Sequence, residues 1–195
     1  GWHLQAPMEC HDFLQRITDR YIEVETEYRK VLGRPMHDGL HYSDDSAQVI
    51  SLKQYREFCV PVGKRLYDTF GCDRYDGRFM HLCGRNVHLH DALLNDLHIT
   101  LLHGYGSANT PEEMIMLAGN VILLGNIDPM TLYQGSQHDI EQETMKILEV
   151  LAPLGGIVLG DGFNIVPGTD LSKMECVRKA SERFGAPTLK RENIH

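Results

Sequence analysis

Several features are scarce or missing in this chain of 195 residues. It contains no apolar run approaching the ~20 residues that a membrane-spanning helix needs, and it does not open with the basic and then apolar segments of a signal peptide. Basic side chains are in the minority, since 19 Lys and Arg stand against 27 Asp and Glu, for a net charge of −8. These absences argue against a membrane or a nucleic acid as the main partner.

Cysteines are few, and their number is odd. The five are scattered along the chain: Cys10, Cys59, Cys72, Cys83 and Cys176. A disulfide framework is therefore not expected, and the pattern favours free thiols or metal ligands in a reducing, cytoplasmic setting. The length and a hydrophobic content of 42% allow one sizeable core, and we expect a single domain over residues 1–195.

The secondary structure pattern begins with two helices and then alternates. Residues 8–32 predict an amphipathic helix that ends at Gly33, with a second helix over 52–71. The apolar positions of the first helix are Phe13, Ile17, Tyr21, Val24, Tyr28 and Val31. A short extended run is expected at 37–45, with later strands at 77–83, 97–106, 120–126 and 155–160 and helices at 88–96, 110–118, 136–151 and 170–184. Such alternation predicts an α/β fold with a parallel sheet covered by helices.

Polar residues follow each expected strand. The junctions are Ser43-Asp44-Asp45, His81-Leu82-Cys83-Gly84, His103-Gly104-Tyr105-Gly106, Gly125-Asn126 and Gly160-Asp161-Gly162. Because the carboxyl ends of parallel strands meet at one edge, these residues can form a shared site. The alternative is that strand-to-loop junctions are polar in any protein.

His81 and Cys83 are the residues with the most specific chemistry. They are two positions apart on a strand, so their side chains point to the same face, where imidazole and thiolate form half of a zinc shell. On spacing alone, a buried cysteine and a structural histidine remain the alternative. His88 and His90 are expected to be solvated residues at the start of a helix.

Four segments resemble the C-terminal part of the uroporphyrinogen decarboxylase superfamily. They are "SDDSAQVISLKQYREFCVPVGKRL", "HLCG", "LLGNIDPMTLYQGSQHDI" and "GGIVLGDGFNIVPGTDLSKMECVRKASERFG", in the family's order and spacing. The resemblance covers residues 36–186 and implies the C-terminal portion, about five or six β/α units, of a (β/α)8 TIM barrel. Residues 1–35 would form an N-terminal helix and linker, and residues 187–195 a tail.

That superfamily has two main branches, which the resemblance helps to separate. One branch decarboxylates uroporphyrinogen without a cofactor. The other transfers methyl groups between a corrinoid and a thiol or another methyl donor or acceptor, and it binds zinc through H-x-C and a distant cysteine. "HLCG" resembles H-x-C, which implies zinc at His81 and Cys83, whereas Asp161 replaces the histidine of the decarboxylase "GHGI" element. The resemblance therefore implies a corrinoid-dependent methyltransferase, or a truncated relative of one.

The resemblance has two departures. Alignment on "PGT" places Phe163 where the distant cysteine is expected, and Cys176 is a poor substitute, so Asp45 or Asp161 would have to supply an oxygen ligand. A full barrel also needs about 250 residues, so the N-terminal half is expected to be missing from this sequence.

Further site residues are expected at the other strand ends. Asp45, Asp161 and His103 are candidate catalytic groups, and Gly104, Tyr105 and Asn126 are candidate contacts to the corrinoid. Each has a structural alternative. His103 can be a satisfied structural histidine, Tyr105 a core aromatic and Asn126 a turn-making hydrogen-bond anchor, while Asp45 or Ser46 can cap a helix.

Three functions remain open at this point. Zinc-assisted methyl transfer leads, with a free or protein-bound corrinoid and a small thiol or methyl donor as partners. A cofactor-free decarboxylase predicts carboxylate-binding arginines, of which Arg85 is the one candidate, and a partial barrel can also be a non-catalytic binding module. Because an unclosed parallel sheet exposes its edges, we expect association on the open side, as a homo-oligomer or with an N-terminal half.

Overall fold

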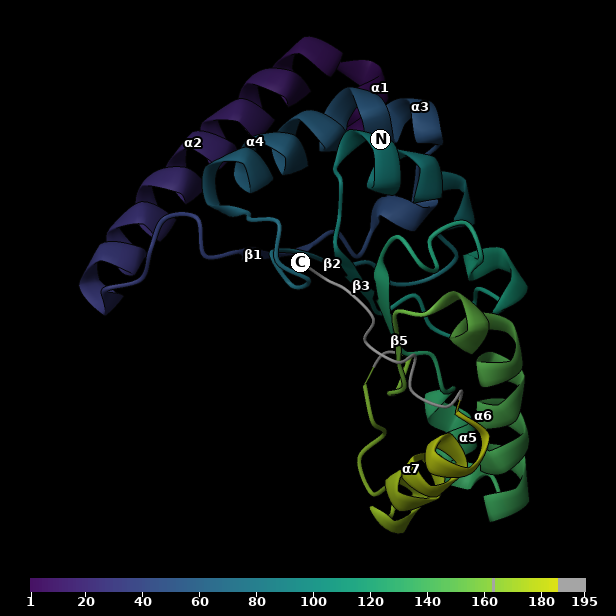
Figure 1. Cartoon of the computed structure of the whole chain (residues 1–195). Coiled ribbons are helices and arrows are strands. Elements are labelled where there is room, and N and C mark those ends of the chain that lie inside the picture. Colours follow the sequence, from purple (N-terminus) through teal and green to yellow (C-terminus); the bar gives the residue numbers. More distant parts are fainter. Residues whose placement is uncertain (163, 186–195) are drawn as a thin grey trace.

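The computed structural model describes residues 1–162 and 164–185. A parallel sheet of five strands lies at its centre, and the strands follow one another in the order of the sequence (Figure 1). The strands are β1 (Leu40–Ser43), β2 (Arg78–His81), β3 (Leu101–His103), β4 (Ile122–Leu124) and β5 (Ile157–Val158). The predicted parallel α/β fold is confirmed, with strands shorter than the sequence indicated.

Helices and helical turns connect the strands. The α-helices are α1 (Trp2–Gln5), α2 (Pro7–Leu32), α3 (Leu52–Gln54), α4 (Val60–Phe70), α5 (Pro129–Gln134), α6 (Gln137–Leu151) and α7 (Ser172–Phe184). The short 3₁₀ or π turns are η1 (Ala47–Val49), η2 (Tyr55–Cys59), η3 (Val87–Leu89), η4 (Ala92–Asp96), η5 (Glu112–Met114) and η6 (Ala152–Leu154). None of the helices in the described part of the chain has the length and apolar character to cross a membrane.

Several predicted helices differ from the observed ones. The helix expected over 52–71 is observed as α3, the π turn η2 and α4 in direct succession, and Pro61 lies in the first turn of α4, directly after the π turn. The helix predicted at 110–118 is wrong, since only the turn η5 forms there. Helix α5 was not predicted, because the turn signals of "GNIDP" concealed a helix in which Asp128 is the N-cap.

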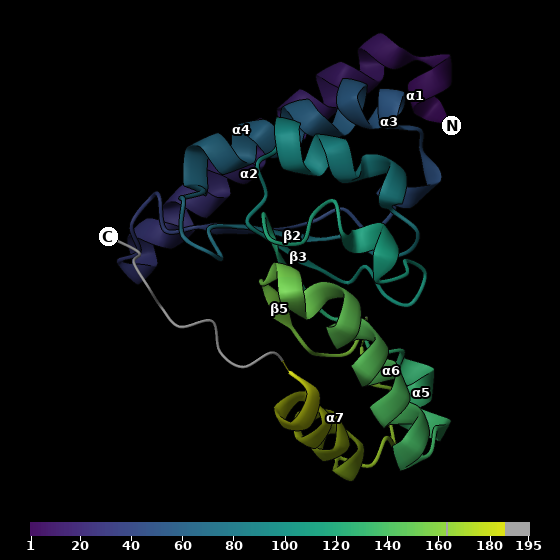
Figure 2. The same ribbon diagram turned by 45° about the vertical axis from the view of Figure 1, so that its right-hand side comes forward.

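The two faces of the sheet have different environments. Met80, Leu102 and Leu123 occupy paired positions on three strands and are almost fully buried beneath the helices. The opposite face carries His41, Phe79 and, at the far edge, the half-exposed Val158. Figures 1 and 2 show the helices arranged as an arc on one side of the strands. The other face, which would line the inside of a closed barrel, stays open along the described residues.

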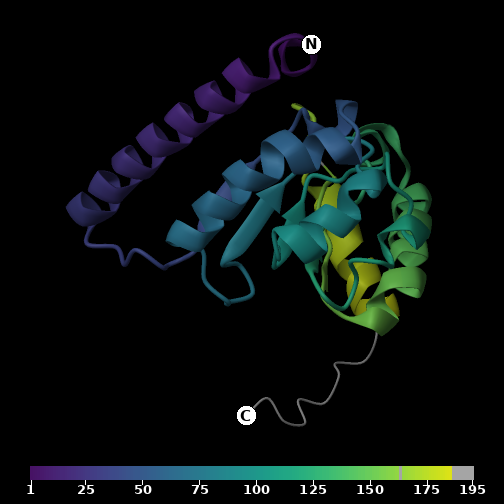
Figure 3. The ribbon, with the colours of Figure 1, turned by 90° about the horizontal axis from the view of Figure 1, so that it is seen from above.

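Helix α2 packs on α4 and η2, and it is the outermost element on the β1 side (Figure 3). Its apolar stripe, from Phe13 to Val31, is exposed, whereas Cys10, Thr18 and Arg29 are buried. The sequence pattern correctly predicted the helix, but it did not predict which face of it is buried.

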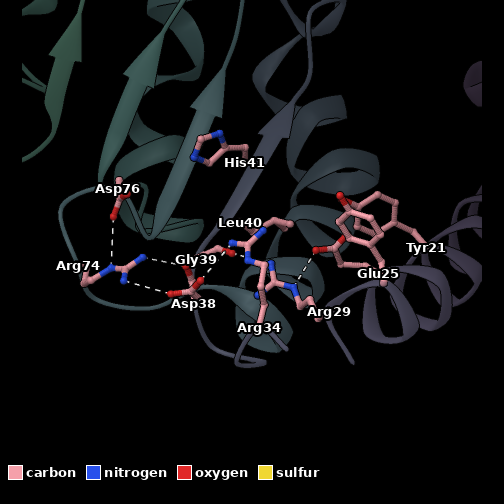
Figure 4. Close-up of a pocket in the computed structure, with 11 residues that line it drawn as sticks. Tyr21, Glu25, Arg29, Arg34, Asp38, Gly39, Leu40, His41, Arg74 and Asp76 are labelled. Carbon is pink, nitrogen blue, oxygen red and sulfur yellow. Dashed lines mark hydrogen bonds and ion pairs between the residues drawn. The ribbon is translucent and has the colours of Figure 1, made fainter. Parts of the chain in front are cut away.

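Arg29 fastens the end of α2 to the start of β1. Arg29 is 1% exposed and forms an ion pair with Glu25 (Figure 4). Its guanidinium also donates to the carbonyl oxygens of Pro35, Met36 and Gly39 at 2.7–3.1 Å. Four of its five N–H groups therefore have acceptors, which is what a buried arginine requires.

Candidate metal centre

Asp45, His81 and Cys83 converge at the carboxyl ends of β1 and β2. One donor atom from each lies within 4.8 Å of the others. His81 Nε2 lies 3.1 Å from Asp45 Oδ1 and 3.2 Å from Cys83 Sγ. The alternation of side chains explains the grouping, because Ser43, which precedes Asp45 by two positions, pairs with His81 in the strand register. All three donors therefore point to the open face of the sheet.

Asp44 comes one position before Asp45, so its side chain points to the opposite face of the sheet. Its carboxyl group points into the helix layer beside Cys59 and Tyr55, and burial there raises its pKa. Ser46, at the N-cap of η1, makes no side-chain capping bond. The capping alternative for this segment is therefore not observed, and the carboxylate of Asp45, whose side chain is 57% exposed, is available to a ligand.

His103 supports His81 from the neighbouring strand. The two residues are paired in the register of β2 and β3, and their Nδ1 atoms share a hydrogen bond of 2.9 Å. Burial and the adjacent His81 lower the pKa of His103, and the carboxylate of Asp161 opposes this shift. His103 thus fixes the orientation of His81, whose Nε2 points toward Asp45 and Cys83.

Gly104 makes room for the His81 ring. Its φ is +82°, and a Cβ atom built on it would lie 2.7 Å from His81 Nδ1 and closer still to Cε1. Gly104 was predicted to contact a corrinoid; in the structure its observed role is to let the imidazole lie against the backbone. Any side chain here would push the ring out of its place.

Cys83 is a protonated thiol in this arrangement. Burial, together with the hydrogen bond to Asp45 and the negative charge of that residue, raises the pKa of Cys83 to about 11. A cation between the three donors would reverse this effect, because a coordinated thiol is deprotonated by the metal.

Asp161 follows β5 and pairs by a single parallel bridge with Ile127. Its charge acts on His103, but it does not belong to the three-donor group. Of the two acids predicted as the third ligand, the structure therefore brings Asp45 to the cluster. Phe163, predicted to replace the distant cysteine, lies outside the described residues.

Asn126 and Tyr105 are buried, and both have structural roles. Asn126 Nδ2 donates to the carbonyl oxygens of Gly106 at 2.7 Å and Asn109 at 3.1 Å, so the anchor alternative is the observed one. Tyr105 is 0% exposed, which corrects the expectation that its ring contacts the corrinoid and makes the core-aromatic alternative the observed one. Both residues support the loops around the site from within.

A buried polar network beside the site was not predicted. Asn109 donates to the carbonyls of Gly84 and Tyr105, and its Oδ1 accepts from the backbone N–H of Asn86. Asn86 in turn contacts His90 Nε2 at 3.0 Å. His90 is fully buried, and burial lowers its pKa to about 4, so the prediction of a solvated residue was wrong. Lone asparagines in loops carry no spacing signal that would have revealed this network.

Comparison with known proteins places the chain in a family. Residues 1–184 match the uroporphyrinogen decarboxylase (URO-D) family. The chain belongs to this family. Among solved structures, the URO-D chain is similar to a methyltransferase from Methanosarcina mazei, with a TM-score of 0.59 and 21% sequence identity. The similarity covers 75% of this chain and 42% of the methyltransferase, so the URO-D chain spans less than half the length of that protein.

The donor set of this URO-D chain fits zinc. Sulfur, imidazole nitrogen and carboxylate oxygen are all zinc ligands, and their atoms are close enough to surround one ion after small side-chain rotations. Three protein ligands leave a fourth position open, which is typical of catalytic zinc sites. His103 is a suitable outer partner, since ligating histidines donate their second N–H to a fixed acceptor.

Proposed function

We propose that this chain carries the zinc site of a corrinoid-dependent methyltransferase, at which a methyl group moves between a corrinoid and a thiol or another methyl donor or acceptor. The observation that carries the proposal is the convergence of Asp45, His81 and Cys83 on the open face of a URO-D fold. The similarity to a methyltransferase supports the fold on which the proposal rests.

The residues have distinct roles in this proposal. Asp45 Oδ, His81 Nε2 and Cys83 Sγ hold the zinc ion. When bound, zinc supplies positive charge that stabilises a substrate thiolate or polarises the oxygen of a methyl leaving group. His81 donates its Nδ1 hydrogen to His103, and this bond fixes the tautomer that leaves Nε2 free for the metal. Burial and His81 lower the pKa of His103 more than the charge of Asp161 raises it, which favours the neutral imidazole whose Nδ1 accepts this hydrogen.

The open face is the side from which the corrinoid would reach the cluster. His41 and Phe79 stack there with ring centroids 4.3 Å apart, and Phe79 is tilted against His103. These rings form a flat, partly apolar surface leading to the donors, and in the proposal they contact the corrinoid in place of the buried Tyr105.

Arg85 does not favour the decarboxylase alternative. Carboxylate-bearing substrates need free guanidinium groups, but Arg85 donates through both terminal nitrogens to Glu113 and also to the carbonyl of Ala108. The positive charge of Arg85, which follows β2, is therefore already paired with the carboxylate of Glu113. Release of CO2 from uroporphyrinogen by metal-free protein would support that alternative and overturn the proposal.

Metal analysis tests the proposal directly. The purified chain should bind about one zinc ion, and cobalt in its place should give thiolate-to-metal charge-transfer absorption. Cys83→Ser should abolish that absorption and Asp45→Ala should weaken binding, whereas Cys176→Ser and His138→Gln, which lie on α7 and α6, should change neither. A wild-type chain that binds no metal would overturn the zinc site. Loss of methyl transfer from methylcobalamin to a thiol in Cys83→Ser, but not in Cys176→Ser, then tests the activity.

A further inference from the structure

A second cavity, of about 300 Å³, lies between the loops after β3 and β4 and the helices α5 and α6. The polar residues that line it include Asn109 and Thr110 after β3, Asn126 and Asp128 after β4, and Glu143 and Lys146 on α6. None of its lining residues belongs to the three-donor metal cluster. Its volume is at the lower end of the range for small-molecule sites.

Asn126 presents an unused acceptor to this cavity. The residue is 4% exposed, and its Nδ2 donates to the carbonyl oxygens of Gly106 and Asn109. These two bonds determine which end of the amide is the oxygen. Oδ1 accepts no hydrogen bond from the described residues and is not sealed from solvent, so it faces the cavity that Asn126 lines. A nearly buried amide oxygen of this kind needs a donor from outside the chain.

Two half-buried carboxylates also line the cavity. Asp128 Oδ1 accepts from the backbone N–H of Met130 at 2.7 Å, and Glu143 Oε1 accepts from the backbone N–H of Asp128 at the same distance. Each carboxylate keeps a second oxygen for which the described chain supplies no donor. Together with Oδ1 of Asn126, these oxygens match an ammonium group, which has three hydrogens to donate.

Lys146 supplies a positive charge next to these acceptors. It is exposed, forms no ion pair with the described residues, and follows Glu143 by three positions on α6, so the two side chains are neighbours on the helix. A phosphate would be repelled by the two carboxylates, and a simple amine would leave Lys146 without a partner. A ligand that carries an ammonium and a carboxylate close together satisfies both signs of charge. The buried side chains of Pro111 and Ile147 add an apolar part to the lining.

We propose that this cavity binds a free α-amino acid with a small side chain, at a site separate from the metal cluster. The ammonium group of the ligand donates to Asn126 Oδ1 and to the free oxygens of Asp128 and Glu143. Its carboxylate pairs with Lys146, and its side chain lies against Ile147. An α-amino acid suits these neighbouring charges because it carries both of its charged groups on one carbon.

Isothermal titration calorimetry of the full chain with small α-amino acids tests the site. The probes are glycine, L-alanine, L-serine, L-threonine and L-valine, and at least one should bind with a Kd below about 1 mM. The two analogues of the best probe that lack its ammonium or its carboxylate should bind about tenfold more weakly or worse, because each loses a charged hydrogen bond. Lys146→Met and Glu143→Gln should weaken binding of the best probe to a similar degree. Glutamine keeps the oxygen that accepts from the N–H of Asp128 and removes only the charge.

Three variants serve as controls, and circular dichroism checks that every variant keeps its helices. Glu149→Gln on α6 and Lys64→Met on α4 change exposed charges outside the cavity and should bind the best probe as the wild type does. Cys83→Ser should also bind it fully, because binding by chelation of a metal at the cluster would depend on that thiol. Failure of all five probes to bind would overturn the proposal. So would full affinity in Lys146→Met, full affinity for either analogue, or loss of binding in Cys83→Ser.

Discussion

Replacing Gly104 with alanine should weaken the metal site without removing any metal ligand. The added Cβ would lie 2.7 Å from His81 Nδ1 and closer still to Cε1, whereas an ordinary contact is about 3.4 Å or more. The ring must therefore retreat by about 1 Å, while zinc sites tolerate deviations of only about 0.2 Å in ligand distance. The hydrogen bond between His81 and His103 would be lost in the same movement.

The expected effect has two parts. Alanine at φ +82° costs about 1–2 kcal/mol of folding free energy from backbone strain. Displacement of His81 should in addition weaken zinc affinity by roughly 10- to 100-fold, the usual loss when the support of a ligating histidine is removed. Competition with a chromogenic zinc chelator measures the affinity, and urea unfolding measures the stability.

Gly155 offers a matched control. Its φ of +78° is nearly the same, but a Cβ there would meet nothing within 4 Å. Gly155→Ala should therefore lose stability through backbone strain alone and keep full zinc affinity. If Gly104→Ala binds zinc as tightly as Gly155→Ala does, the steric account of the His81 position is refuted.

Three further predictions concern buried polar groups. The pKa of His90 is about 4 in the fold and about 6.5 in the unfolded chain. The unfolded chain therefore takes up a proton at a higher pH than the folded protein does. The free energy of unfolding should be at its full value above pH 6.5 and should fall by about 2 kcal/mol between pH 7 and pH 5. Urea titrations should show this loss in the wild type and not in His90→Gln. Asn126→Ala leaves two buried carbonyls without their donor and should cost about 2–3 kcal/mol in the same assay. Arg29→Met leaves Glu25 without its ion pair and three carbonyls without a donor, and it should cost about 3–5 kcal/mol.

Each of these predictions has a contradicting result. An equal pH dependence in wild type and His90→Gln would assign the acid sensitivity to other groups. A free energy of unfolding for Asn126→Ala equal to that of the wild type would mean that water replaces the Asn126 amide as the donor to the two carbonyls. Unchanged unfolding of Arg29→Met would mean that α2 is held by packing alone.

The fold and part of the site follow from local sequence patterns. Alternating strand and helix signals are sufficient for the parallel sheet, and the period of two along a strand is sufficient to place His81 and Cys83 on one face. The same rule separates Asp45 from Asp44 once the position of β1 is known. Asp45 and Asp161 could not be ranked as third ligands from sequence, because each follows a different strand and the register between strands is a tertiary property.

Other features depend on contacts that no local pattern encodes. The bond between His81 and His103 arises because β2 and β3 pair in one particular register. Gly104 matters to the site because the His81 ring lies against it. The sequence does not reveal this contact, because a glycine after a strand predicts only a turn. The periodicity of α2 indicates a helix with an apolar side, but it does not say whether that side meets this chain or another one. Amphipathicity therefore located the apolar side of α2, which is exposed in the described part of the chain.

Arg29 also determines how the molecule opens locally. One guanidinium holds the last turns of α2, the connection at Pro35 and Met36, and Gly39 at the entrance to β1. None of these segments can detach without breaking bonds of the same side chain, so they form one cooperative unit. Amide hydrogens in residues 25–32 and 39–43 should then exchange with solvent at a common opening free energy, although a loop separates them in the sequence.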